Sequence, residues 1–238
     1  AGLMIAQARV PTPGKDYDAC IKAICRLLVL LKAESGVDAS SIGIGVPGSV
    51  DRDTGLISKG FQAGLHGHYL AADLQALTNC PVKAANDANC FALSEATDGA
   101  GAGAEIVFGV ILGTGVGSGI VVNGKVLEGA NAISGEWGHI PLPDPTEDER
   151  PGPKCNCGAN GHLETWLSGP AIARDYAQLA GIPLKDAPNT ANIVKMAETD
   201  TLAEKTLCRF EERLARGLAV IVNVIDPDII VLGGGVSN

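Results

Sequence analysis

The sequence predicts an α/β protein with two domains. Strand-like and helix-like segments alternate along its 238 residues, which is typical of α/β folds. Three apolar strand-like runs end in glycines, in the motifs GIGVPG, GVILGTGVG and IIVLGGG, and such an arrangement brings a ligand to the ends of the strands. Residues 98–104 (DGAGAGA) are small and flexible. We therefore expect a smaller domain over residues 1–98 and a larger one over residues 99–238.

The elements of the first domain follow from apolar spacing and turn residues. Residues 2–10 resemble a strand that enters a turn. Apolar residues recur at every third or fourth position between 16 and 36, which predicts a helix with a glycine at its C-cap. Short β-branched runs predict strands over 42–46 and 81–85. A helix over 86–97 then opens at an Asn-Asp pair.

The second domain is expected to begin with a hairpin. The apolar runs 106–112 and 120–122 flank a glycine-rich turn, as in a β-hairpin. The polar and proline-rich stretch 141–153 is a loop, and a helix follows Ser168.

The last helix and the last strand lie near the end of the sequence. Thr201 and Glu204 stand in the register of a capping box at the start of a long amphipathic helix. Asp226-Pro227 ends this helix, and residues 228–232 form a buried-type strand that leads into three glycines.

The composition excludes several classes of function. The net charge is −9 and Lys and Arg form no block, so we expect no nucleic-acid partner. There is neither an apolar run of about 18 residues nor a signal peptide at the start, so we expect no membrane partner. Seven scattered cysteines are typical of a reducing compartment rather than a disulfide framework. The expected location is the cytoplasm.

Two histidines and two cysteines are spaced like the ligands of a metal ion. His139, Cys155, Cys157 and His162 form the pattern H-x15-C-x-C-x4-H, and four such side chains suffice for tetrahedral zinc. The alternative is a pair of free thiols near unrelated histidines. With all four positions filled by protein, the ion would be structural. The free ring nitrogen of His139 would then be available to a ligand hydroxyl.

Two glycine-rich turns are candidates for binding phosphate. The turn that joins the hairpin strands exposes backbone N–H groups and leaves room for an anion; its residues are Gly113, Thr114, Gly115, Val116 and Gly117. A hairpin turn without a ligand is the alternative. The triplet Gly233, Gly234 and Gly235 is either a turn that contacts a nucleotide or a close packing of strand against helix.

Three carboxylates and one amide complete the candidate site. Asp87 is either a helix N-cap or a general base that takes a proton from an attacking hydroxyl. Asn86 would hold an acceptor sugar through its amide. Glu136 and Glu164 flank the proposed zinc loop and are either solvated surface groups or ligands of neighbouring sugar hydroxyls.

At this point the sequence resembles the ROK family of sugar kinases and regulators. Six motifs carry the resemblance, in family order and over nearly the whole chain: GIGVPG (43–48), NDANCFALSEA (86–96), ILGTGVGSG (111–119), GEWGH (135–139), CNCGANGHLE (155–164) and DPDIIVLGGGVSN (226–238). The resemblance is closest to bacterial fructokinases and mannokinases, through VPTPGKDY and GEWGHIPLP. The N-acetylglucosamine kinases are similar too.

The resemblance implies an actin-like, hexokinase-like ATPase fold, with two α/β domains and mixed sheets around an interdomain cleft. It implies ATP, Mg²⁺, structural Zn²⁺ and a homodimer. It also implies roles for individual residues: Asp87 as general base; Gly48, Asn86, Glu136, His139 and Glu164 as sugar ligands; Gly113, Thr114, Gly115, Gly117 and Gly233 to Gly235 at the nucleotide; and His139, Cys155, Cys157 and His162 at the zinc.

The sequence departs from the family pattern in three places. His162 stands where the family usually has a third cysteine, and histidine is an equally good ligand of tetrahedral zinc. Residues 58–67 (SKGFQAGLHG) lack asparagines that the fructokinases tend to show. The sequence starts beyond the family's D-x-G-G-T phosphate loop and stops before its closing helix, so we expect the natural protein to be longer.

The expected function is ATP-dependent phosphorylation of a hexose, with fructose as the first candidate. N-acetylglucosamine kinase and glucokinase are alternatives within the family. A sugar-sensing transcriptional regulator and an inactive fragment that binds sugar without turnover are alternatives of other classes.

Overall fold

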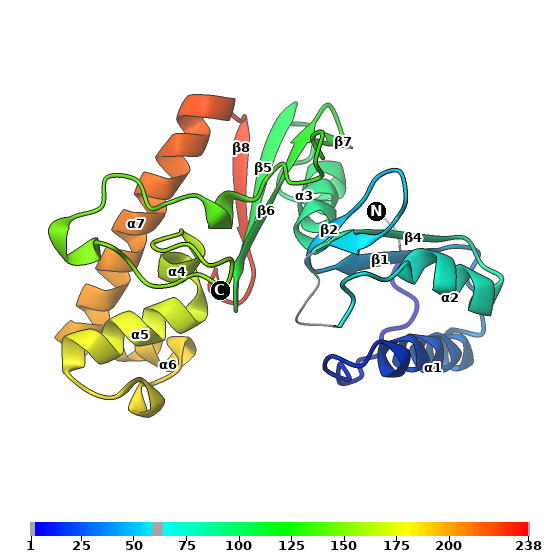
Figure 1. Ribbon diagram of the computed structural model, residues 1–238, viewed down its shortest axis with the longest axis horizontal. Helices are drawn as coiled ribbons and strands as arrows, with labels where there is room; N and C mark the ends of the chain where they lie inside the picture. The colour runs from blue at the N-terminus through cyan, green and yellow to red at the C-terminus, as the bar shows by residue number, and fades with distance from the viewer. Residues whose placement is uncertain (1–2, 59–63, 238) are drawn as a thin grey trace. The chain divides into compact units, whose positions relative to one another are not determined.

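The computed structural model describes residues 3–58 and 64–237 (Figure 1). Its contacts form two compact units, Ala1–Cys90 with Glu128–Ser134, and Phe91–Leu127 with Gly135–Asn238. The domain boundary near Gly99 stays a prediction. Within the described part of the chain, no helix is both long and apolar enough to cross a membrane.

The first unit is built on a pair of parallel strands. Strand β1 (Ile42–Val46) pairs with β4 (Val82–Asn86), while β2 (Ser49–Val50) and β3 (Ile57–Ser58) form an antiparallel ladder. Helix α2 (Leu70–Thr78) contributes apolar side chains to the core of this unit. Strands 42–46 and 81–85 were therefore predicted to within one residue.

Helix α1 (Tyr17–Ser35) is the predicted first helix, with both caps in place. The side chain of Asp16 accepts the N–H of Ala19, and Gly36 adopts φ 71°, a left-handed conformation that favours glycine. The strand expected over residues 2–10 is not formed, since residues 3–10 have no regular structure; a strand needs a hydrogen-bonded neighbour, and these residues pair with none of the described strands. Residue 2 lies outside the described residues.

The second unit contains a mixed sheet of four strands in the order β7-β6-β5-β8. Its strands are β5 (Ile106–Leu112), β6 (Val116–Val122), β7 (Lys125–Val126) and β8 (Ile229–Gly233). Strand β5 pairs antiparallel with β6, as the hairpin prediction required, and parallel with β8. The parallel pairing of β5 with β8 makes the sheet mixed.

Helices cover both faces of this sheet (Figure 1). Val107 packs with Ala92 of α3 (Asp87–Asp98), whereas Phe108 and Val110 pack in a second cluster that includes Ile221. The alternation reflects the two-residue period of a strand. The other helices are α4 (Glu164–Leu167), α5 (Gly169–Ala180), α6 (Thr190–Met196) and α7 (Thr201–Ile225), with 3₁₀ turns η2 (Trp137–His139), η3 (Glu147–Glu149) and η4 (Leu184–Asp186).

Helix α7 is capped differently from the prediction. Asp200, not Thr201, is the N-cap, because its carboxylate accepts the N–H groups of Leu202 and Ala203. An ionised carboxylate is among the best acceptors at a helix N-terminus, so the helix begins one residue earlier than the proposed capping box requires. The predicted end is confirmed, since α7 stops at Ile225.

Helix α3 packs directly against Gly109 in β5. A Cβ atom at this position would lie 2.8 Å from the Cβ of Ala92, so we expect Gly109→Ala to destabilise the protein by about 1–3 kcal/mol through overpacking. Thermal unfolding measures the change. Gly43→Ala in β1 is the control, because nothing lies within 4 Å of its added Cβ. Equal melting temperatures for the two variants would contradict the proposed close packing.

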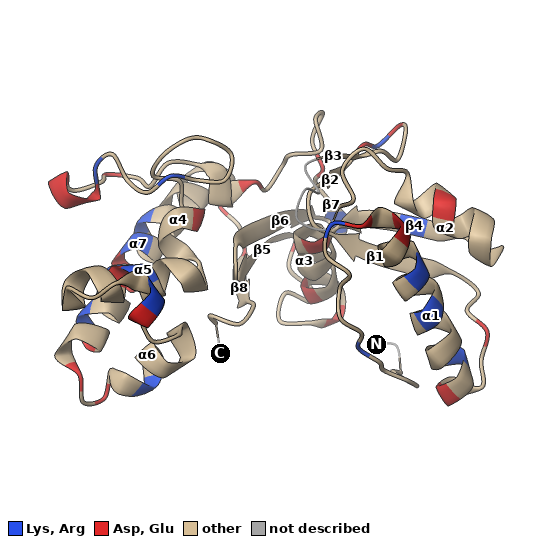
Figure 2. Cartoon of the chain, turned by 60° about the horizontal axis from the view of Figure 1, so that its bottom comes forward, with Lys and Arg blue, Asp and Glu red and all other residues tan. Residues whose placement is uncertain are grey.

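A buried network of charges joins η3 to α7 and α5. The carboxylate of Glu149 lies 2.9 Å from Nε of Arg213 and 2.8 Å from Nη2 of Arg216. Arg213 also contacts Asp175 at 3.2 Å, and its guanidinium stacks over the ring of Trp166. Acidic and basic residues are interleaved on α5 and α7 (Figure 2). This network attaches the loop before the cysteines to the long helix.

Glu149 gives the network a dependence on pH. Burial alone would raise its pKa, but hydrogen bonds from Arg216 and Arg213 lower the pKa of Glu149 from 4.5 to about 2. Its contribution to stability is therefore complete above about pH 4.5 and lost as the pH falls toward 2. We expect Glu149→Gln to lower the free energy of unfolding by about 3 kcal/mol at pH 7, and by less at pH 3. Urea unfolding at both pH values tests this.

The matched control for this prediction is Glu147→Gln, an exposed carboxylate of the same turn. We expect it to leave stability unchanged to within about 0.5 kcal/mol at both pH values. A deficit of Glu149→Gln that stays constant from pH 7 to pH 3 would contradict the assigned titration.

Candidate functional site

Asn86 caps helix α3 at the end of β4. Its Oδ1 accepts the N–H of Asn89 at 3.0 Å, and its Nδ2 donates to the carbonyl oxygen of Gly48 at 2.9 Å. Asn86 is therefore the N-cap of α3, a role that was one of the two alternatives for Asp87. The amide of Asn86 is engaged at both ends, which fixes it against the loop that follows β1. One amide hydrogen remains for the predicted contact with a sugar.

Asp87 is the first residue of α3, and although the residue as a whole is exposed, its carboxylate is partly screened from solvent. Its Oδ1 accepts the N–H of Ala88 at 2.8 Å, and no side chain among the described residues donates a hydrogen bond to the carboxylate. Partial burial of the carboxylate raises the pKa of Asp87, although the N–H of Ala88 acts in the opposite direction. A carboxylate with a raised pKa and no donor side chain beside it is suited to accept a proton.

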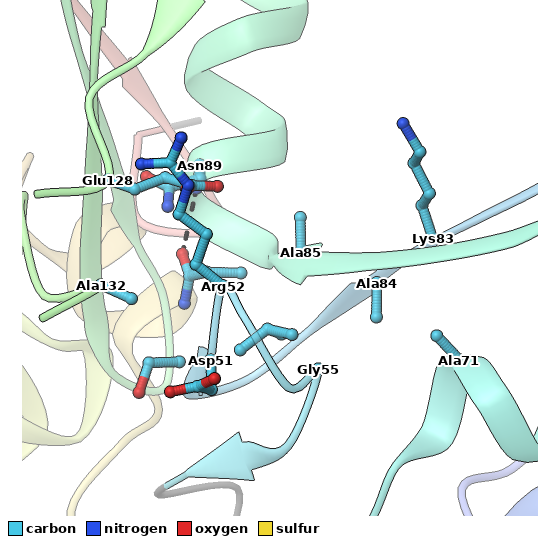
Figure 3. A pocket seen from close by; sticks show the side chains of 13 residues that line it. Asp51, Arg52, Gly55, Ala71, Lys83, Ala84, Ala85, Asn89, Glu128 and Ala132 are labelled. Carbon is cyan, nitrogen blue, oxygen red and sulfur yellow. Dashed lines mark hydrogen bonds between the residues drawn. The ribbon is translucent and has the colours of Figure 1, made fainter. Parts of the chain in front are cut away.

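A polar cavity of about 390 Å³ lies within the first unit beside Asn86 (Figure 3). Charged side chains of Asp51, Arg52 and Glu128 line it, together with Asn89. The Oδ1 atom of Asn89 is buried and has no hydrogen-bond partner among the described residues. A cavity of this size and polarity accommodates a small polar molecule. Asp87 is not part of its lining.

The four predicted metal ligands lie together. The ligand atoms of His139, Cys155, Cys157 and His162 are all within 4.8 Å of one another. The Sγ of Cys155 lies 3.5 Å from Nδ1 of His139, and the Sγ of Cys157 lies 3.3 Å from Nδ1 of His162. Tetrahedral zinc with ordinary bond lengths places sulfur and nitrogen ligands about 3.6 Å apart. The donor set and its spacing therefore fit zinc, with His162 in the fourth position.

The orientation of His139 leaves one ring nitrogen available. Its Nδ1 faces Cys155, and its Nε2 lies 3.8 Å from Oε2 of Glu136. Both side chains are about one-third exposed. A zinc ion on Nδ1 would fix the imidazole ring, so that Nε2–H and the Glu136 carboxylate offer a donor beside an acceptor. Neighbouring hydroxyls of a monosaccharide require such a pair.

The glycine turn between β5 and β6 has two unused backbone donors at its tip. The N–H of Gly113 donates to the carbonyl of Gly115 at 3.0 Å, and the N–H of Val116 donates to Oε2 of Glu164 at 3.2 Å. The N–H groups of Thr114 and Gly115 make no hydrogen bond within residues 3–58 and 64–237. They are the donors that a phosphate group would find here.

Two of the three glycines at the end of β8 allow close packing with neighbouring residues. A Cβ at Gly233 would lie 2.5 Å from the ring of Phe91, and a Cβ at Gly234 would lie 2.8 Å from the carbonyl carbon of Leu112. At Gly235 nothing lies within 4 Å of an added Cβ. Two of the three glycines therefore have a packing reason, and Gly235 is the one whose open side leaves room for a ligand.

The predicted site residues fall into two sets. Gly48, Asn86 and Asp87 belong to the first unit, and the candidates from Gly113 onward belong to the second. Within each unit the structure brings the expected partners together. That the two sets face a common cleft stays a prediction. The sequence did not reveal the contact of Glu164 with the glycine turn, which joins residues 48 positions apart.

Comparison with known proteins identifies the family. The ROK family model matches residues 1–238. The chain is 39% identical over 236 residues to an N-acetyl-D-glucosamine kinase of Shigella flexneri, which covers 98% of this chain and 77% of that protein. It also resembles the crystal structure of a ROK hexokinase from Thermus thermophilus, with a TM-score of 0.79 and 33% identity over 96% of this chain and 73% of that one.

A second solved structure agrees with the first. It is a ROK glucokinase from Streptomyces griseus in complex with glucose and AMPPNP, with a TM-score of 0.79 and 28% identity over 96% of this chain and 75% of that one. These similarities confirm the predicted α/β class and the actin-like ATPase fold. With a family model that spans the whole sequence and a fold shared with its kinases, the chain belongs to the ROK family.

Proposed function

We propose that this chain, a sugar kinase of the ROK family, transfers the γ-phosphoryl group of ATP to the primary hydroxyl of N-acetyl-D-glucosamine. The observation that carries the choice of sugar is the 39% identity to N-acetyl-D-glucosamine kinase over 236 residues. The motifs alone favoured fructose. The similarity supports the alternative sugar better. Half of residues 58–67, on which the doubt about fructose rested, lie outside the described residues.

Asp87 accepts the proton of the sugar hydroxyl as its oxygen bonds to the γ-phosphorus and the bond to the bridging oxygen of ADP breaks. In a loose phosphoryl-transfer transition state the proton leaves late. The protein therefore acts mainly by positioning the reactants. Mg²⁺ bound together with ATP would supply neutralisation of the phosphate charge.

The second unit supplies the remaining contacts. Glu136, His139 and Glu164 orient the sugar hydroxyls. The N–H groups of Thr114 and Gly115 hold phosphate oxygens, a common arrangement at glycine-rich turns. Structural zinc on His139, Cys155, Cys157 and His162 would fix the imidazole of His139 so that its Nε2–H donates to the sugar.

A coupled assay of ADP release over a panel of hexoses tests the proposal. We expect kcat/KM to be at least about tenfold higher for N-acetylglucosamine than for glucose, mannose or fructose, since the pocket must satisfy the acetamido group. A clear preference for fructose would overturn the choice of sugar. Saturable sugar binding without ADP release from any hexose would overturn the kinase assignment and favour a sensor. The expected homodimer stays a prediction, which sedimentation tests.

A further inference from the structure

The carboxylate of Glu164 lies on the glycine turn that we assign to phosphate. Its Oε2 accepts the N–H of Val116 at 3.2 Å. A Cβ at Gly115 would lie only 2.7 Å from the same oxygen. A side chain at position 115 would therefore displace the Glu164 carboxylate from where it lies. A residue expected to bind sugar thus contacts the turn expected to bind nucleotide.

The backbone also ties the two segments together. Glu164 begins α4, whose other three residues are buried. The N–H of Gly169, just after α4, donates to the carbonyl of Gly113 at 2.8 Å. Both ends of this short segment are therefore attached to the turn. A displacement of the Glu164 side chain would break its hydrogen bond with the N–H of Val116.

Glu164 brings a carboxylate to the glycine turn. No Lys or Arg forms an ion pair with it in the part of the chain that the structure describes. Its carboxylate is half-buried, where a like charge is screened less than in open solvent. It occupies the N–H of Val116, which adjoins the free N–H groups of Thr114 and Gly115. A phosphate that approaches the turn would therefore be repelled by the Glu164 carboxylate, and it would find the N–H of Val116 already occupied.

We propose that Glu164 makes nucleotide binding depend on the sugar. Without sugar, its carboxylate covers the N–H of Val116 and repels phosphate. When sugar hydroxyls donate to this carboxylate, they disperse its charge and draw it from Val116, whose N–H joins those of Thr114 and Gly115. The inference rests on the proposed kinase function and adds an order of binding to it, in which sugar binds before ATP.

The test is the affinity for Mg²⁺-AMPPNP, measured by calorimetry with and without N-acetylglucosamine. For the unmodified chain, we expect saturating sugar to lower the Kd for AMPPNP about tenfold, a usual size for coupling between sites. Glu164→Gln keeps the shape but removes the charge. We expect this variant to bind AMPPNP about tenfold more tightly without sugar and to bind sugar more weakly. Its Kd for AMPPNP should no longer change when sugar is added.

Glu136→Gln is the matched control, because Glu136 is also an expected sugar ligand, but no hydrogen bond or ion pair joins its side chain to the turn within the described residues. It should weaken sugar binding and leave the Kd for AMPPNP without sugar unchanged. If Glu164 has only a structural role, Glu164→Ala should weaken the binding of both sugar and AMPPNP, and Glu164→Gln should change neither affinity. Zinc content, measured on each variant, shows whether the cysteine loop is intact.

The outcomes separate this inference from the proposed function. If the unmodified chain binds AMPPNP but Glu164→Gln binds it with equal or lower affinity, the inference is overturned and the kinase assignment stands. If the unmodified chain binds no AMPPNP with or without sugar, both are overturned.

Discussion

Asp87→Asn is expected to lower kcat for sugar phosphorylation by about 10²–10⁴-fold, the usual contribution of a positioned general base. The substitution preserves the size of the side chain and an oxygen that accepts the N–H of Ala88, so the start of α3 should persist. Only the capacity to take a proton is removed. Coupled ADP release at saturating ATP measures kcat, and its dependence on sugar concentration gives KM.

The split between kcat and KM identifies the role of Asp87. We expect the KM for sugar to change less than about threefold in Asp87→Asn, because the proton is transferred in the transition state rather than on binding. Glu136→Gln should show the opposite pattern, a raised KM with a smaller loss of kcat. Equal losses of both parameters in both variants would contradict the division between a base and an orienting ligand.

Cys155→Ser is expected to abolish zinc binding and to lower the melting temperature by about 10 °C. Cys155 is the buried member of the four candidate ligands, and the energy of a structural zinc site is largely folding energy. The loss of zinc should also weaken sugar binding, since the ring of His139 is no longer held. Metal analysis and thermal unfolding measure the two effects on one sample.

Cys208→Ser provides the control for the zinc prediction, because Cys208 is an exposed thiol of α7 outside the metal group. It should retain zinc and melt like the unmodified chain. Prolonged treatment of the unmodified chain with a strong chelator should reproduce the effect of Cys155→Ser. A chain that melts at the same temperature with and without zinc would refute a structural role for the metal.

Local features could be predicted from the sequence because their causes are local. Helix α1 was predicted with both caps, since Asp16 and Gly36 directly flank an amphipathic run. The metal ligands lie within a stretch of 24 residues, from His139 to His162, and their residue types determine the chemistry. The hairpin of β5 and β6 also follows from neighbouring segments.

Features that depend on tertiary contacts could not be predicted. The sequence contains no sign that Glu164 would contact Val116, because nothing local joins a hairpin turn to a helix 48 residues later. The pairing of Glu149 with Arg213, which spans 64 residues, is similar. The choice of Asn86 over Asp87 as the cap of α3, and of Asp200 over Thr201 in α7, concerns adjacent residues of similar capping propensity. Side-chain orientation decides between them.

The two tryptophans, Trp137 and Trp166, are both buried and both belong to the second unit. Indole fluorescence therefore reports on that unit alone, whereas far-ultraviolet circular dichroism follows the helices of both. Denaturation monitored by the two signals in parallel distinguishes a single cooperative transition from stepwise loss of structure. Every variant described above can thus be assigned to the unit that it destabilises, without an added label.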